Sequence, residues 1–199
     1  MKLAATVSFL SYLALQGHST PLSDAEKVRF SCIQWCPVRS HTRLLQRAVD
    51  QACGFATVPL LRAFNPTAVD HFYTTNISEM EIAVGSGSYV SQGDAGYVLP
   101  SQAPNSVPLY RMYHPVWIDH MYTVDEAEKE YATTTAGYVD QGITAYVFPS
   151  GVCETVEFYR VYNPVAVDHF YTTNATEKEV ALTTQDYVDE GNAGYISLQ

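Results

Sequence analysis

The chain has 199 residues, 47% of them hydrophobic, which is enough for one domain with a buried core. Its charge is uneven: residues 1–53 hold six Lys or Arg and three Asp or Glu, whereas residues 54–199 hold five and eighteen, so balances of +3 and −13 give the net charge of −10. A strongly acidic body lacks the clustered cations that contact phosphates, which excludes nucleic acid as an expected partner.

The N-terminus has the pattern of a secretory signal peptide. Lys2 is followed by a mainly apolar run from Leu3 to Leu15 and then by small and polar residues up to Thr20. We assign residues 1–20 to the signal peptide rather than to a core helix. The run is short for a transmembrane span, and no other segment is a candidate. We therefore expect a secreted, extracellular protein.

Residues 21–54 are expected to form a helical N-terminal cap that contains most of the cysteines; a propeptide removed on maturation is the alternative. Ser23 and Glu26 have capping-box spacing, and a second helix is expected from Thr42 to Gly54. Secretion permits disulfides. Because Cys32 and Cys36 would share one helical turn, we expect each to reach to one of the remaining two cysteines. The full set of predicted disulfide residues is Cys32, Cys36, Cys53 and Cys153.

Residues 55–199 consist of three repeats, 55–103, 104–152 and 153–199, whose matching positions lie 49 residues apart. The clearest motif is Asp-His-Phe/Met-Tyr-Thr, which begins at Asp70, Asp119 and Asp168. A fixed period of this length is typical of stacked or ring-closed repeats.

Each repeat predicts the order ββαββ. A strand ends at an Asn-Pro or His-Pro pair, and the Asp-His strand returns beside it as a hairpin. A short helix follows, capped by Asn76, Asp125 or Asn174 with a Glu three residues later. Two further strands are expected around a tight turn at the shared glycine, Gly93, Gly142 or Gly191.

We expect these repeats to close round a pseudo-threefold axis, which would leave no exposed strand edges. The predicted fold is mainly β with one short helix per repeat, arranged like a three-bladed propeller. A β-trefoil-like arrangement is the alternative, although a helix within each unit is not typical of it.

The motif Leu-Tyr-Arg-x-Tyr-Asn-Pro, Asp-His-Phe-Tyr-Thr, Gly-Tyr-Val, Glu-Gly and Ala-Gly-Tyr recurs over residues 59–199. It resembles the repeat of an uncharacterised secreted family found in fungal extracellular proteins and beside cell-wall-acting or lipolytic domains in bacteria. The resemblance implies a non-catalytic extracellular module that binds carbohydrate. His114 in place of Asn and Met121 in place of Phe depart from the motif and imply a different site in the second repeat.

The recurring polar residues have both structural and ligand-binding interpretations. Arg62, Arg111 and Arg160 are expected to pair with the motif aspartates across each hairpin. Histidine can hold a sugar hydroxyl, tyrosine can stack on a sugar ring, and Trp117 lies in a hairpin loop where the other repeats have alanine. A site of three converging histidines for a metal is less favoured. The candidate ligand-binding residues are Asn65, Asp70, His71, Tyr73, Trp117, Asp119, His120, Tyr122, Asn163, Asp168, His169 and Tyr171.

Two sequons, at Asn76 and Asn174, mark potential N-glycosylation sites, although an asparagine that caps a helix is a poor acceptor. The chain shows no nucleotide-binding loop, zinc signature or nucleophile motif, so we expect no cofactor and no metal. The predicted function is a secreted lectin-like glycoprotein with up to three equivalent carbohydrate sites, whose partner is a carbohydrate or glycoprotein. A protein-interaction or effector role is the alternative, and a hydrolase is the least favoured.

Overall fold

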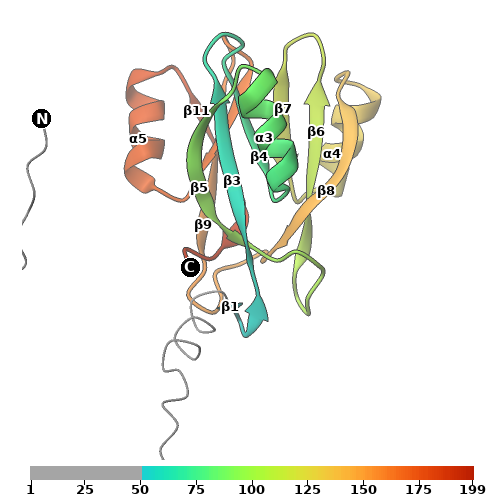
Figure 1. Ribbon diagram of the computed structural model, residues 1–199, viewed down its shortest axis with the longest axis vertical. Helices are drawn as coiled ribbons and strands as arrows, with labels where there is room; N and C mark the ends of the chain where they lie inside the picture. The colour runs from blue at the N-terminus through green and yellow to red at the C-terminus, as the bar shows by residue number, and fades with distance from the viewer. Residues whose placement is uncertain (1–50) are drawn as a thin grey trace, which may run out of the picture. The chain divides into compact units, whose positions relative to one another are not determined.

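The computed structural model describes residues 51–199 (Figure 1). The expected signal peptide, the first expected helix, Cys32 and Cys36 lie outside these residues. The prediction that the second helix continues to Gly54 is wrong. Gln51–Ala52 forms strand β1 instead, which pairs with β2 (Phe55–Ala56). Cys53 and Gly54 make the turn between them with positive φ angles of 54° and 80°, a conformation that a helix cannot continue.

Three similar groups of elements follow, one in each repeat. Repeat 1 contains β3 (Val58–Asn65), β4 (Asp70–Thr74), α3 (Ile77–Ser86) and β5 (Val90–Val98). Repeat 2 contains β6 (Val107–His114), β7 (Asp119–Thr123), α4 (Glu126–Thr134) and β8 (Val139–Val147). Repeat 3 contains β9 (Val156–Asn163), β10 (Asp168–Thr172), α5 (Ala175–Thr184) and β11 (Val188–Ile196).

Each repeat forms a three-stranded antiparallel sheet, with its first strand in the centre: β4-β3-β5, β7-β6-β8 and β10-β9-β11. The predicted hairpins are confirmed, but the predicted third and fourth strands are one strand. In repeat 1 both halves of β5 pair with β3, from Val90 opposite Phe64 to Val98 opposite Val58. Gly93, with φ 81°, lies at a register shift and not at a chain reversal, so it forms a bulge within one bent strand.

The three predicted helix caps are confirmed. The side-chain oxygens of Asn76, Asp125 and Asn174 each accept backbone N–H groups from the first turn of α3, α4 and α5. The reciprocal half of the capping box is absent in the described part of the chain. In repeat 1 the backbone N–H of Asn76 donates to Thr74, and the Glu79 carboxylate binds Thr74 and Arg111 instead.

A shared core joins the three repeats. The second strands β4, β7 and β10 contact one another, and their tyrosines pack with residues from all three sheets. Each helix packs on the first strand of its own repeat, over a separate small apolar cluster. The ends of β5, β8 and β11 are linked by β-bridges at Tyr97–Ser197, Leu99–Tyr146 and Phe148–Tyr195. The coarse prediction of a mainly β fold with three similar units is therefore confirmed.

One disulfide joins Cys53 to Cys153, over a sequence separation of 100 residues. The expectation that Cys32 and Cys36 each bind one of these cysteines is therefore wrong, because Cys53 and Cys153 bind each other. Among residues 51–199, no helix is long and apolar enough to cross a membrane.

Candidate functional site

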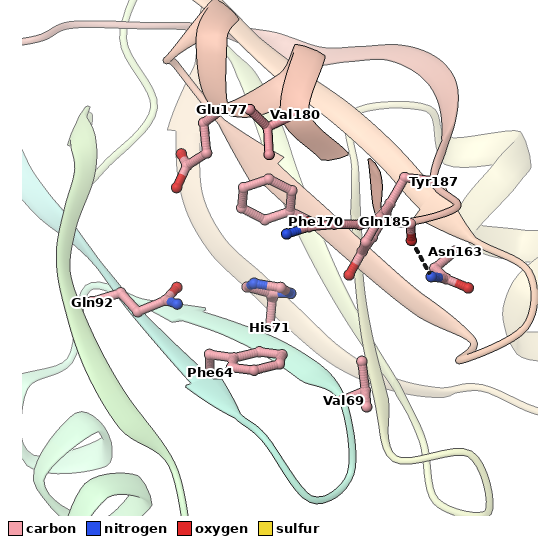
Figure 2. Close-up of a pocket in the computed structure, with 10 residues that line it drawn as sticks. All are labelled: Phe64, Val69, His71, Gln92, Asn163, Phe170, Glu177, Val180, Gln185 and Tyr187. Atoms are coloured by element: carbon pink, nitrogen blue, oxygen red, sulfur yellow. Dashed lines mark hydrogen bonds between the residues drawn. The ribbon is translucent and has the colours of Figure 1, made fainter. Parts of the chain in front are cut away.

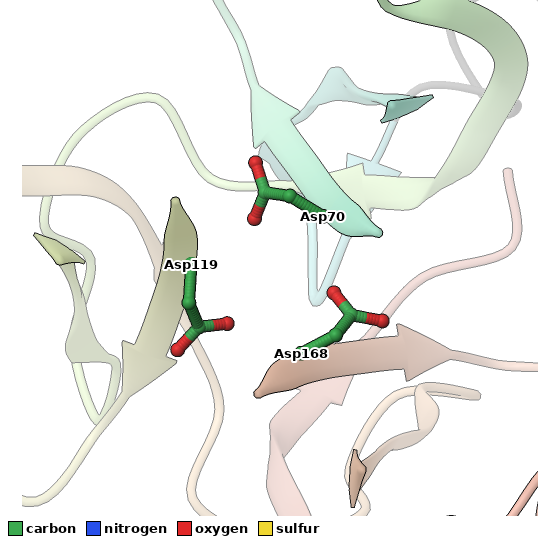
Figure 3. Close-up of side chains that lie close together, drawn as sticks. All are labelled: Asp70, Asp119 and Asp168. Atoms are coloured by element: carbon green, nitrogen blue, oxygen red, sulfur yellow. The ribbon is translucent and has the colours of Figure 1, made fainter. Parts of the chain in front are cut away.

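The three motif aspartates converge from β4, β7 and β10 (Figure 3). Asp70, Asp119 and Asp168 are fully buried, and one carboxylate oxygen of each lies within 4.8 Å of the others. Carboxylate oxygens suit a hard cation in type. However, each carboxylate already accepts three hydrogen bonds, two from a histidine of another repeat and one from a tyrosine of its own repeat. We therefore assign the cluster to hydrogen bonding between repeats.

These hydrogen bonds link the repeats in cyclic order. The Asp168 carboxylate accepts a hydrogen bond from the backbone N–H of His71 at 2.9 Å and binds Nδ1 of the same histidine at 2.7 Å. Asp70 binds His120 in the same way, and Asp119 binds His169. The third donors are the hydroxyls of Tyr187, Tyr89 and Tyr138 respectively. Burial acts to raise the pKa of Asp119, but the hydrogen bonds from His169 and Tyr138 outweigh it and hold that pKa below its usual value.

The motif tyrosines form a second cyclic network deeper in the core. The hydroxyl of Tyr73 donates to the carbonyl of Tyr171, that of Tyr122 to Tyr73, and that of Tyr171 to Tyr122, at 2.6–2.8 Å. Each hydroxyl also accepts the backbone N–H of a tyrosine in another repeat. The three side chains are at most 1% exposed, so they do not fit the expected role of sugar-stacking platforms.

The repeated arginines bind glutamates of neighbouring repeats, which corrects the predicted pairing with the motif aspartates. Arg62, Arg111 and Arg160 make bidentate contacts of 2.8–3.0 Å to Glu177, Glu79 and Glu128. The aspartates are unavailable because histidines and tyrosines occupy their oxygens. Burial acts to raise the pKa of each of these three glutamates, but the arginine and a threonine hydroxyl lower it below the usual value.

A cavity of about 350 Å³ opens between repeats 1 and 3, in front of His71 (Figure 2). Its walls combine aromatic rings with hydrogen-bonding side chains. The imidazole lies between the rings of Phe64 and Phe170, with both centroid distances 4.5 Å. Because Asp168 holds Nδ1, the ring presents Nε2 to the cavity. The lining residues are Phe64, Val69, His71, Gln92, Asn163, Phe170, Glu177, Val180, Gln185 and Tyr187.

The corresponding interface between repeats 3 and 2 has other residues at several lining positions, such as Met121 for Phe170 and Tyr131 for Val180, and one further change alters the charge. Glu190 occupies the place that Gln92 has in repeat 1, 98 residues earlier. Its Oε2 lies 3.1 Å from Arg160 Nε and 3.8 Å from His169 Nε2. The first contact is an ion pair without hydrogen-bond geometry. Glu190 is half-buried, whereas Gln92 is exposed.

Comparison with protein families decides the membership of the chain. A family model described as "Domain of unknown function (DUF5648)" matches residues 59–197, from β3 to just beyond β11. The chain belongs to this family. Neither the curated proteins nor the solved structures gave a significant match. The DUF5648 region therefore contains all three repeats, the aspartate cluster and the cavity.

Within the DUF5648 region, the candidate residues of the hairpin turns have structural roles. Asn65 and Asn163 are buried; each accepts backbone N–H groups of its turn and donates to the carbonyl after the helix, Gly87 or Gln185. Asn163 also borders the cavity. Repeat 2 has His114 in place of the asparagine. Its Nδ1 accepts a hydrogen bond from the backbone N–H of Trp117, and its ring stacks on the indole with the centroids 3.9 Å apart.

Both sequon asparagines of the DUF5648 region are exposed. Only the side-chain oxygen is used in capping, as in Asn76, where Oδ1 accepts from Ser78 and Glu79 at 3.0 and 3.3 Å. Glycosylation modifies the side-chain nitrogen, so a capping role leaves the acceptor atom of Asn76 and Asn174 accessible. Glycosylation at these two positions stays a prediction.

Eight of the ten cavity residues are absent from the ligand contacts expected from the sequence: Phe64, Val69, Gln92, Phe170, Glu177, Val180, Gln185 and Tyr187. At these positions the repeats differ from one another, or the residue already has a structural role. Phe64 aligns with the tyrosines Tyr113 and Tyr162, and Gln92 aligns with Gln141 and Glu190. Divergence between otherwise matching repeats was the available indication.

Proposed function

We propose that the protein is a secreted, non-catalytic carbohydrate-binding module whose principal site is the cavity between repeats 1 and 3. The observation that carries this proposal is the combination of Phe64, Phe170 and Tyr187 with the polar groups of His71, Gln92 and Asn163 in one open cavity. Sugars bind through hydroxyl hydrogen bonds and apolar ring faces, and such a lining offers both. The volume of about 350 Å³ lies near the lower end of small-molecule sites, roughly 300–1,000 Å³, and suits one or two sugar units.

Several features favour binding over catalysis. The lining residues contain no serine, threonine or cysteine beside His71, within the part of the chain that the structure describes. Their one carboxylate, Glu177, has both oxygens bound to Arg62. A hydrolase would need a second carboxylate or a nucleophile in the same cleft.

The proposed architecture is a small ring of three units, similar to a three-bladed propeller, with the β-trefoil as the alternative. The cyclic hydrogen bonds of the aspartates and of the tyrosines support it, because each connects every repeat to the next. Secretion is proposed from the N-terminal pattern and from the resemblance to fungal and bacterial extracellular proteins. The disulfide is compatible with an oxidising compartment.

A glycan array probed with labelled protein, followed by calorimetry on each positive glycan, tests the proposal. Val180→Trp would narrow the cavity from α5 and should abolish binding. Tyr131→Trp changes the equivalent exposed position of repeat 2 and should leave binding intact. Absence of binding to any glycan at micromolar protein, or equal binding by the two variants, would overturn the proposed site.

An apolar surface supports a second candidate, a protein-interaction role. The hairpin turns expose Val116 (78%), Trp117 (48%) and Val165 (84%) to solvent. Exposed apolar groups that gather in a patch are typical of protein contacts, and Val116 and Trp117 are neighbours in one turn. If the turns bind a protein, Val116→Ser together with Val165→Ser should weaken that complex without changing glycan binding through the cavity.

A further inference from the structure

The two interfaces of repeat 3 supply an internal comparison. Between repeats 3 and 2, an arginine, a histidine held by a buried aspartate and a carboxylate come together as Arg160, His169 and Glu190. Between repeats 1 and 3, the arginine and the histidine recur as Arg62 and His71, and a cavity borders the histidine. At the position of the third member, the carboxylate, repeat 1 has the neutral Gln92, as repeat 2 has Gln141.

Arg160 and His169 face Glu190 in repeat 3. Their counterparts in repeat 1, Arg62 and His71, have hydrogen-bonding groups without a partner in the described part of the chain. Arg62 Nε is buried and has no hydrogen-bond partner among residues 51–199; Arg160 Nε has none either, but it has the Glu190 carboxylate 3.1 Å away as an ion-pair partner, which Arg62 Nε lacks. The His71 ring uses only Nδ1 within the same range, with Nε2 directed to the cavity. A buried guanidinium N–H without a partner costs free energy, and an incoming acceptor would relieve that cost.

The surrounding charges are also the same at the two interfaces. Glu177 neutralises Arg62 as Glu128 neutralises Arg160, through two hydrogen bonds each. Asp168 binds His71 as Asp119 binds His169. Since the fold accommodates the Glu190 carboxylate in this environment, the same environment can accept a carboxylate from a ligand.

From this comparison we infer that the ligand of the cavity between repeats 1 and 3 carries a carboxylate, and that its sugar class is an acidic saccharide such as a uronic acid. This inference rests on the proposed carbohydrate function and adds the charge of the ligand. The carboxylate takes the position that Glu190 occupies in repeat 3. His71 Nε2 faces this carboxylate, while Nδ1 is hydrogen-bonded to Asp168. Phe64 and Phe170 border the sugar ring.

Two reciprocal exchanges test the inference. Gln92→Glu supplies the carboxylate from the protein itself, so galacturonate should bind about tenfold more weakly or not at all. Gln92→Met keeps the length of the side chain without charge and should retain galacturonate binding. Glu190→Gln removes the internal carboxylate from the other interface and leaves the cavity between repeats 1 and 3 intact, so its galacturonate binding should equal that of the parent protein.

Calorimetry with galacturonate, galactose and benzoate separates the inference from the proposed function. A preference of about tenfold or more for galacturonate over galactose, lost in Gln92→Glu, supports it. Equal affinity for the two sugars would contradict the inference that the ligand carries a carboxylate, while the proposed carbohydrate binding would remain supported. Binding of benzoate but of neither sugar supports the carboxylate and overturns the carbohydrate function. If neither carboxylate binds at millimolar concentration, the inference is wrong, whatever neutral glycans bind on the array.

Discussion

Two regions of the molecule differ in how far the three repeats agree. One is the buried network where the three second strands meet, and the other is the cavity between repeats 1 and 3. In the network, aspartate, histidine and tyrosine are the same in all three copies, and every copy makes the same contacts. Around the cavity, the copies differ: Phe64 aligns with two tyrosines, and Gln92 aligns with Gln141 and Glu190. Identity between repeats therefore indicates a structural role here, and divergence indicates where a ligand can bind.

This contrast has a physical origin. A group that joins one repeat to the next must be matched by its partner in every repeat, so a change in one copy leaves a buried polar atom unpaired. A residue at an open interface has solvent as its alternative partner and can change at little cost. The following predictions test whether the two regions separate in stability and in binding.

The largest effect is expected from loss of a central tyrosine. Tyr171→Ala removes a fully buried ring from the shared core and should lower the free energy of unfolding by about 3–5 kcal/mol. Tyr171→Phe keeps the ring but leaves the N–H and carbonyl of Tyr122 without their partner, for a loss of about 1–3 kcal/mol. Urea unfolding followed by circular dichroism measures both. Losses below 0.5 kcal/mol, roughly the value for a surface change, would place the ring outside the core.

A somewhat smaller loss, about 3 kcal/mol, is expected for Asp70→Asn. The amide has one acceptor oxygen for three donors from His120 and Tyr89, and its own N–H groups oppose them. Asp119→Asn should cost about the same because its contacts in the next repeat are equivalent. Urea unfolding of the two variants side by side is the measurement. Unequal losses would show that the network does not act as a threefold set.

The sequence was sufficient for the local elements of each repeat. Alternating residues that end at Pro66, Pro115 and Pro164 predicted the first hairpins, and an Asn or Asp with a following helical stretch predicted the caps. These features depend on contacts within a few residues. The bulge at Gly93 was mistaken for a turn because both need a glycine at positive φ, and only the pairing partner of the following residues distinguishes them.

Contacts between repeats could not be read from the sequence in the same way. The carboxylate of Asp70 lies within the same hairpin as Arg62, yet Arg62 binds Glu177, 115 residues away in the sequence. Perfect periodicity conceals this choice, since a partner in any copy has the same residue type. Three residues of the motif strand, Asp70, His71 and Tyr73, were expected to contact a ligand, whereas all five residues of β4 are buried. The cavity depends on side chains from both the first and the last repeat, so no single copy predicts it.

A moderate and pH-dependent loss is expected from the glutamates that join the repeats. Glu128→Gln removes the charge that binds Arg160 and should cost about 1–2 kcal/mol at neutral pH. The pKa of Glu128 is lowered in the folded state from 4.5, so its contribution is complete above about pH 4.5 and is lost as the pH falls further. Unfolding curves from pH 7 to pH 3 should therefore converge for the two proteins at the acid end. A constant difference over that range would contradict the assignment.

The smallest effect on stability is expected at the divergent hairpin turn of repeat 2. Trp117→Ala removes a half-exposed ring that stacks on His114, and should lower the free energy of unfolding by at most about 1 kcal/mol. Trp117→Phe is the matched variant, since it retains an aromatic ring for the stack. If the apolar turns bind a protein partner, a pull-down with Trp117→Ala should lose that partner while the variant unfolds at nearly the same urea concentration as the parent. A loss of several kcal/mol would instead place Trp117 with the structural network, and the division between repeated and divergent residues would not hold at this turn.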